Sequence, residues 1–431
     1  MDRRSFLKIA AMSGLAVAAP FGVRRALAQP KPYEGPYFVL INAGGGYDPI
    51  YLCDPKPQGA YNRLYAAGAK AGGINYAPVT LDAAALGVDA EALPYLMSNQ
   101  VFFEKYASDL LVLNGVDMST NNHDAGSRAI WSGQLSEGAP SFGALVAAAR
   151  APDSALAFVS AGGYDATQGL IPLTRMSSVD TLKKIAYPNE TSPGDPMTET
   201  FHSKATADRI RKAQEERLAA KQMAARLPRA KAAMGELILA RGSDDVLRDL
   251  VLPDTPVALP GYQLYDLQGL MQQAQLAVAA FKAKMAVAAN LNIGGFDTHG
   301  NHDSDQIRQL AKLLAGVDFL MQEAEAAGIA GQLTVVIGSD FGRGPAYNGD
   351  NQYAGKDHWT VSSVMMMGKG IKGNRVVGST DDAQLAVPVD GKKLKPETIH
   401  LALRKLAGID TAEVTADFPL AGDDMPTLLS G

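Results

Sequence analysis

The chain has 431 residues, with 40 basic and 45 acidic side chains and a formal net charge of −5 at pH 7. Its lysines and arginines form no basic stripe interleaved with aromatic residues, which argues against a nucleic-acid partner. Hydrophobic residues make up 47% of the chain, enough for a large core, and Cys53 is the single cysteine, so no disulfide can form within the chain.

The first 28 residues are expected to be a twin-arginine signal peptide. Paired arginines stand in Asp2-Arg3-Arg4-Ser5-Phe6-Leu7-Lys8, an apolar run covers 9–23, and Ala26-Leu27-Ala28 suits cleavage after its last alanine. Gly14 and Pro20 interrupt the run, which is shorter than the roughly 20 apolar residues of a spanning helix, so no stable membrane span is expected after cleavage. Cleavage would remove five basic residues and one acid and leave a net charge of −9. We therefore expect the twin-arginine translocase as a partner during export, and a periplasmic location.

Beyond the signal peptide, short apolar runs bounded by turn residues predict buried strands. The runs lie at 37–41, 110–116, 157–160, 286–291, 333–337 and 361–367. Helical patterns separate them, most clearly between Ile307 and Met321, where apolar residues recur every three or four positions. This alternation predicts an α/β fold, with a largely parallel central sheet covered by helices on both faces, in a single domain over 29–431.

A segment rich in Ala, Lys, Arg, Glu and Gln runs from Thr198 to Arg241 and is broken only by Pro228. This composition predicts a helical insert at about 196–262, between two strands of the sheet. Its basic residues stand among Glu and Asp, which is typical of a solvated helical face.

Side chains that bind metals follow four of the predicted strands. They stand in the segments 42–48, 294–303, 339–343 and 355–359. Open α/β sheets place their sites beyond the carboxyl ends of the strands, so these segments predict the functional site. Four of the six histidines lie here or in the loop after Val116. Imidazole together with carboxylate predicts a divalent transition ion, with zinc or manganese as the first choices.

The histidines divide into two groups. For His299, His302 and His358, the neighbouring carboxylates favour a metal or catalytic role. For His202 and His400, which stand in helical patterns, a hydrogen-bonded surface or core residue is the simpler interpretation.

The glycines at 44–46 have neither the Gly-Lys-Ser/Thr ending nor the GxGxxG spacing of phosphate-binding loops. The simpler interpretation is a sharp turn that brings Asp48 over the edge of the sheet.

A hydroxyl between the second strand and its helix is a candidate nucleophile. Ser119 and Thr120 stand where helix-terminal amides could hold a transferred group and a metal could lower the pKa of a hydroxyl. Serine and threonine are also the commonest helix N-caps, so both interpretations stay open.

With these motifs the chain resembles the DUF1501 family, which is exported by the twin-arginine route and belongs to the alkaline phosphatase and sulfatase superfamily. The resemblance is carried by the first strand with its glycines, the His123 loop, the segment 294–302, the segment 339–343 with 355–359 downstream, and the helix around 398–403. It covers most of the mature chain and implies an alkaline-phosphatase-like fold.

The resemblance also implies a centre with one or two divalent ions around a hydroxyl nucleophile. The implied ligands of one ion are Asp48 and Asp340, and those of the other are Asp297, His302 and His358, with His299 as an alternative to His302 and Asp357 as a neighbouring candidate. Two such ions would clamp a transferring phosphoryl or sulfuryl group.

The sequence departs from the superfamily pattern where Asp-His is usual, because Asp340-Phe341 stands there and one imidazole is lost. Arg343 or His123 could compensate, and Arg343 could instead bind substrate oxygens through its planar guanidinium. A site with one ion, or one that no longer catalyses, is therefore an alternative.

The leading hypothesis from the sequence is an exported metal-dependent hydrolase that acts on a small anionic ester of phosphate or sulfate. The segment Cys53-Asp54-Pro55-Lys56-Pro57 matches only half of the sulfatase nucleophile motif and follows a different strand, so Cys53 is interpreted as structural. The alternative is a non-catalytic periplasmic binding or assembly protein on the same fold. A redox protein lacks support, since neither CxxC nor a dinucleotide fingerprint is present.

Overall fold

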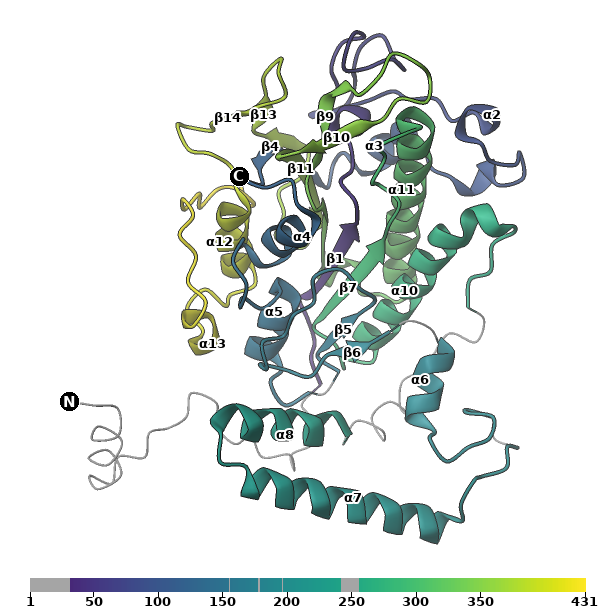
Figure 1. Ribbon diagram of the computed structural model, residues 1–431, viewed down its shortest axis with the longest axis vertical. Helices are drawn as coiled ribbons and strands as arrows, with labels where there is room; N and C mark the ends of the chain where they lie inside the picture. The colour runs from purple at the N-terminus through teal and green to yellow at the C-terminus, as the bar shows by residue number, and fades with distance from the viewer. Residues whose placement is uncertain (1–31, 155, 177–178, 196, 242–255) are drawn as a thin grey trace, which may run out of the picture.

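The computed structural model describes residues 32–431, apart from 155, 177–178, 196 and 242–255 (Figure 1). The predicted signal peptide over 1–28 lies outside the described residues and stays a prediction. Within the described part of the chain, no helix combines the length and the apolar character needed to cross a membrane.

An eight-stranded sheet with the order β12-β4-β11-β8-β1-β7-β5-β6 forms the centre of the molecule. Its strands are β1 (Tyr37–Ala43), β4 (Leu110–Asp117), β5 (Phe158–Ser160), β6 (Thr174–Arg175), β7 (Ala288–Ile293), β8 (Leu333–Ser339), β11 (Val361–Gly368) and β12 (Arg375–Val377). β1 pairs in parallel with β7 and β8, whereas β11 is antiparallel to both β4 and β8. The predicted α/β fold with a largely parallel sheet is confirmed.

The direction of β11 follows from its connection to β8. The chain leaves β8, forms the antiparallel pair β9 (Gly342–Tyr347) and β10 (Lys356–Trp359), and enters β11 directly. A parallel return would need a crossover connection, usually a helix, and this connection contains none. β9 and β10 therefore stand over the edge of the sheet where β8 ends.

Helices cover both faces of the sheet, as predicted, because side chains of a strand alternate between its faces. In β1, Val39 and Ile41 belong to one hydrophobic cluster with α10 (Tyr265–Lys282) and α11 (His302–Ala326). Phe38 and Leu40 belong to a second cluster with α4 (His123–Ser132), α5 (Phe142–Arg150) and α12 (Pro396–Leu406). Figure 1 shows these two groups of helices on opposite sides of the sheet.

The remaining elements are short or peripheral. They are the helices α2 (Ala83–Leu86), α3 (Asn99–Tyr106), α6 (Val179–Ala186) and α13 (Glu413–Ala416), the 3-10 turns η1 (Pro49–Tyr51), η2 (Leu93–Tyr95), η3 (Tyr262–Leu264) and η4 (Ala330–Gln332), and the strands β2 (Ala69–Ala71), β3 (Ile74–Tyr76), β13 (Ser379–Thr380) and β14 (Ala386–Val387).

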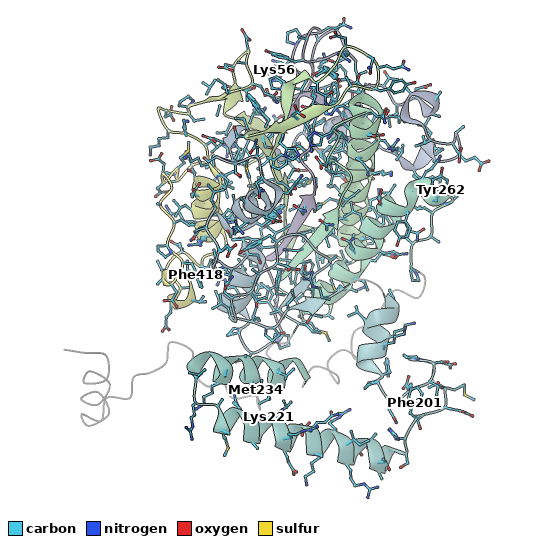
Figure 2. All side chains as sticks on the ribbon, viewed as in Figure 1. Lys56, Phe201, Lys221, Met234, Tyr262 and Phe418 are labelled. Atoms are coloured by element: carbon cyan, nitrogen blue, oxygen red, sulfur yellow. The ribbon has the colours of Figure 1, made fainter. Side chains whose placement is uncertain are left out.

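The predicted helical insert contains α7 (Lys204–Ala224) and α8 (Pro228–Arg241). α7 has no buried residue, as a solvated helix should, and Figure 2 shows Phe201, Lys221 and Met234 on this part of the chain, away from the sheet. His202 is exposed and stands before α7, whose N-cap is Ser203, so its expected helical position was wrong. Residues 196 and 242–255 of the predicted insert lie outside the described residues.

Four parallel strands, β1, β4, β7 and β8, bring their carboxyl ends to one edge of the sheet. This is where the sequence placed the candidate site. Arg343 and His358, which were expected in loops, lie instead in β9 and β10, which cover that edge.

Candidate metal centre

The turn after β1 is built from glycines because other segments approach it closely. Gly45 and Gly46 have φ angles of 118° and 90°, which L side chains rarely adopt. A Cβ on Gly45 would lie 2.5 Å from the backbone nitrogen of Asp297. The turn thus lets the segments after β1 and β7 meet, and it leads the chain to Asp48, which is fully buried.

Asp48 belongs to a network of side chains that lies beneath the surface, which we call the buried network: Asp48, His302, Lys356, Tyr51, Tyr347 and Asp303. Asp48 Oδ2 accepts hydrogen bonds from Lys356 Nζ at 2.7 Å and from His302 Nε2 at 2.9 Å. Asp48 Oδ1 accepts from the backbone nitrogen of Ile50 at 2.9 Å. Burial raises the pKa of Asp48, but Lys356 and His302 more than offset this and hold it below its usual value.

The protons on His302 follow from its partners. Its Nε2 donates to the Asp48 carboxylate, so in the neutral ring Nδ1 accepts from the Thr298 hydroxyl at 2.7 Å. The pKa of His302 is lowered, chiefly by burial, which favours this neutral form. Lys356 and Asp48 therefore form the ion pair, and His302 supports it with a neutral ring.

Two tyrosines complete the buried network. The hydroxyls of Tyr51 and Tyr347 contact each other, and both donate to Asp303 Oδ1. Burial raises the pKa of each phenol far above its usual range, so both stay protonated. Lys356 Nζ lies 5.0 Å from the centre of each of the two rings, close enough for a cation–π attraction.

A second group of side chains lies nearer to solvent, which we call the open cluster: His123, Asp297, His299 and His358. Asp297 Oδ1 lies 3.0 Å from His358 Nε2 and 3.1 Å from His299 Nε2. Asp297 Oδ2 lies 3.4 Å from His123 Nε2. Ligand atoms of His123, Asp297 and His358 all lie within 4.8 Å of one another, close enough to share one metal ion.

The outer nitrogen of each imidazole in the open cluster faces a group that only accepts hydrogen bonds. His358 Nδ1 donates to the carbonyl of Asn121 at 2.9 Å, His299 Nδ1 to Asp357 at 3.1 Å, and His123 Nδ1 to Asp340 at 2.9 Å. In the neutral rings each Nε2 is then a lone-pair acceptor directed inward. His299 Nε2 and His358 Nε2 lie 2.9 Å apart, where two lone pairs repel unless a cation lies against them. This donor set fits a divalent ion.

Arg343 reaches the site through Asp297. Its Nη2 donates to Asp297 Oδ1 at 2.6 Å; burial would raise the pKa of that carboxyl, but the hydrogen bond and the charge of Arg343 lower it to about 2. Three further N–H groups of Arg343 bind the carbonyls of Gly45, Gly46 and Lys356. Arg343 is fully buried and its guanidinium is used within the protein, so it orients Asp297 as a permanently charged carboxylate.

Asp340 stands behind His123. Its Oδ2 accepts from His123 Nδ1 and from the backbone nitrogen of Gly45 at 3.0 Å. Burial raises the pKa of Asp340, although His123 counteracts this. A carboxylate in this position holds the imidazole in the tautomer that presents Nε2 to a metal.

The two candidate hydroxyls lie in the loop before α4, which contacts the open cluster through the carbonyl of Asn121 and through His123. Ser119 is exposed, has a φ of 55°, and donates from its hydroxyl to Asp117 Oδ1 at 3.3 Å. Thr120 Oγ1 accepts from the backbone nitrogen of Asn122, whose side chain caps α4. Neither Ser119 nor Thr120 is the N-cap of that helix.

The structure thus divides the predicted ligands into two groups. Asp297, His299, His358 and His123 meet in the open cluster, with Asp340 and Asp357 bound to its outer nitrogens, while Asp48 and His302 lie in the buried network. The sequence interpretation missed Lys356, although it stands two residues before His358 in the same motif. Lys356 stands in β10, whose residues show no apolar alternation, so the local pattern gave no signal for its position.

Comparisons with solved structures find enzymes of related kinds, all of them distant likenesses. The PsFucS1 sulfatase from Pseudoalteromonas sp. is 11% identical over 100% of this chain and 77% of that chain, with a TM-score of 0.40. The lipoteichoic acid synthase LtaP from Listeria monocytogenes is 8% identical over 98% and 81%, with a TM-score of 0.39. The alkaline phosphatase from the Antarctic bacterium TAB5 is 10% identical over 79% and 93%, with a TM-score of 0.31.

Sequence comparison is more specific. No curated protein sequence matches the chain. The model of a family described as a protein of unknown function, DUF1501, matches residues 37–427 and so spans nearly all of the described chain. The chain belongs to the DUF1501 family.

Proposed function

We propose that this chain is a metal-dependent hydrolase of phosphate or sulfate esters, and that it acts in the periplasm after export by the twin-arginine route. One observation carries the proposal: inward-facing Nε2 atoms of the open cluster converge on a carboxylate whose pKa is about 2. Without a cation these acceptors repel one another. With a divalent ion they form a site of the kind that zinc and manganese occupy.

The direct ligands in this proposal are His123, Asp297 and His358, with His299 as a fourth donor. A bound divalent ion would supply a Lewis acid that withdraws charge from a phosphoryl or sulfuryl oxygen. The protein's own part is to hold Asp297 through Arg343 and to fix the imidazole tautomers. Because His123 and His299 are about half exposed, with side-chain exposures of 40% and 47%, a small anionic ester can reach the site from solvent.

The hydroxyl group that attacks the ester is proposed to come from the loop before α4. Ser119 is the better placed of the two candidates to lose a proton, because its hydroxyl already donates to Asp117 Oδ1. Thr120 is nearer along the chain to His123 and is the second candidate. Replacing each by alanine separates them, since only the nucleophile is needed for hydrolysis.

The test combines metal content with hydrolysis of p-nitrophenyl phosphate, its diester and p-nitrophenyl sulfate. We expect the purified chain to hold zinc or manganese and to hydrolyse at least one of the three esters. His358→Ala should bind no ion, and its rate of hydrolysis should fall by more than about 100-fold. This is more than the loss of an outer-shell partner alone would cause.

His202→Ala is the matched control, because it removes an exposed histidine that stands outside the open cluster. It should keep both metal and activity. A wild-type chain that binds no transition ion, or one whose hydrolysis is unchanged in His358→Ala, would contradict the proposal and favour a binding role on the same fold.

A further inference from the structure

We infer that Lys356 is a built-in cation that takes the place of a second metal ion, so that the centre of this chain binds a single ion in the open cluster. The inference rests on the proposed function for the identity of that one ion. It concerns the buried network, where the family resemblance implied metal ligands and the structure places an ammonium group.

The carboxylate of Asp48 is already engaged within the protein. Both of its oxygens accept hydrogen bonds, and Lys356 Nζ is the nearest partner at 2.7 Å. The side chains of Asp48 and Lys356 are both 0% exposed, so neither exchanges its partner for water. The positive charge of the ammonium already balances the carboxylate in a place where an unpaired charge is costly.

His302 is equally unavailable. A metal ligand must offer a nitrogen lone pair, but Nε2 of His302 donates its proton to Asp48 and Nδ1 is engaged by the Thr298 hydroxyl. Gln306 extends this arrangement, because its side-chain nitrogen donates to Thr298 Oγ1 at 3.0 Å. His358 differs in its surroundings, because its Nε2 lies 2.9 Å from His299 Nε2 in the open cluster, where none of the described lysines is a partner.

The ammonium of Lys356 is held by a backbone carbonyl as well as by Asp48. Besides Asp48, Nζ donates to the carbonyl of Tyr61 at 2.8 Å. The carbonyl of Lys356 itself accepts from Arg343 Nη1 at 3.1 Å, which ties the strand to the guanidinium that orients Asp297. One strand, β10, therefore supplies Lys356 to the buried network and His358 to the open cluster.

The experiment counts ions per chain by elemental analysis after saturation with zinc and removal of excess. We expect one zinc in the wild type, none in His358→Ala, and one in Asp48→Asn, because Asp48 is engaged by Lys356 and not by a metal. Lys356→Ala should leave the Asp48 carboxylate without its cation, so that a second ion takes its place and the count rises to two. Asp48→Asn in the Lys356→Ala background should return it to one.

Two ions in the wild type, loss of the ion in Asp48→Asn, or no second ion in Lys356→Ala would each overturn the inference. If Lys356→Ala does not fold, the count in Asp48→Asn decides, with one ion in support and none against. One ion without ester hydrolysis contradicts the proposed function and leaves the inference standing. Two ions with ester hydrolysis support the proposed function and overturn the inference. A wild type without any ion overturns both.

Discussion

The buried network and the open cluster contain the same kinds of side chain, histidine and aspartate, at the same edge of the sheet. In the buried network Asp48, His302 and Lys356 are 0% exposed, and the Asp48 carboxylate is paired with Lys356 and His302. In the open cluster the side chain of Asp297 is 46% exposed, and the Nε2 atoms of His299 and His358 lie 2.9 Å apart. Burial makes unpaired groups too costly to keep, so only the open cluster can retain them for a ligand.

The comparison also shows how one motif serves both regions. Lys356 and His358 lie two residues apart in β10, yet Lys356 is buried and His358 is partly exposed. The pairing of β10 with β9 shifts register between these two residues. A local irregularity of this kind changes the direction of the side chains that follow it. A short strand can therefore place one side chain in the buried network and another in the open cluster.

The largest effect is expected from breaking the buried ion pair. Lys356→Met leaves the Asp48 carboxylate without its cation in a fully buried place, and loss of one partner of such a pair costs about 3–5 kcal/mol. The urea midpoint of unfolding should therefore fall sharply. His358→Ala, in the open cluster, should move the midpoint far less, because its surroundings can be hydrated.

The double variant Asp48→Asn/Lys356→Met removes both charges and should regain much of the loss. If the urea midpoint of Lys356→Met is close to that of His358→Ala, burial does not make the loss of a side chain more costly in the buried network than in the open cluster. A double variant less stable than either single one would mean that the charges are not coupled.

A smaller effect, about 3 kcal/mol, is expected from pH and concerns a buried histidine outside both regions. His400 in α12 is buried and its Nε2 donates to the carbonyl of Ile130 at 2.8 Å, while burial lowers its pKa to about 4. The unfolded chain binds this proton near pH 6.5, so stability from the neutral ring is complete above that pH. It is lost as the pH falls towards 4, by about 3 kcal/mol at most.

Unfolding by urea at pH 7 and at pH 4.5 checks this effect. His400→Gln keeps a side-chain N–H for the Ile130 carbonyl and should lose less stability between the two pH values than the wild type. The lowered pKa of His302 acts in the same direction, so part of the acid sensitivity should remain. Equal acid sensitivity of the variant and the wild type would contradict the assignment to His400.

The sequence predicted the fold better than the grouping of the site. Apolar runs such as 37–41 and 333–337 need only local pattern to be recognised, and both form central strands. Strand β10 has no such pattern, because Lys356, Asp357 and His358 are all polar or charged. Its position depends on a tertiary partner, Asp48, that lies 308 residues away in the chain.

The same reason explains the histidines. His400 was predicted to be an ordinary core or surface residue, and it lies in the core. His302 and His358 both stand beside carboxylates in the sequence, and nothing local says which of them will be buried. His302 is buried because it is the first residue of α11, which packs in the core, and the sequence near His302 does not show this.

The smallest effect we predict lies in the open cluster. It tests whether the carboxylate that accepts a hydrogen bond from a ligand histidine strengthens metal binding. Asp340→Asn keeps the size of the side chain but removes the charge that accepts from His123 Nδ1. Loss of such an outer-shell partner weakens metal binding by about 10–100-fold, or about 1.4–2.7 kcal/mol. Competition with a chromophoric zinc chelator measures this directly.

Asp357→Asn is the matched comparison, because Asp357 accepts from His299 Nδ1 in the same way but its side chain is 75% exposed, against 7% for Asp340. Water can replace an exposed partner, so Asp357→Asn should weaken zinc binding less than Asp340→Asn does. Equal losses of zinc affinity in the two variants would show that the exposure of an outer-shell carboxylate does not affect its contribution within the open cluster. Burial would then distinguish only the buried network from the open cluster. A larger loss for Asp357→Asn would point to His299 in place of His123 as the firmer ligand.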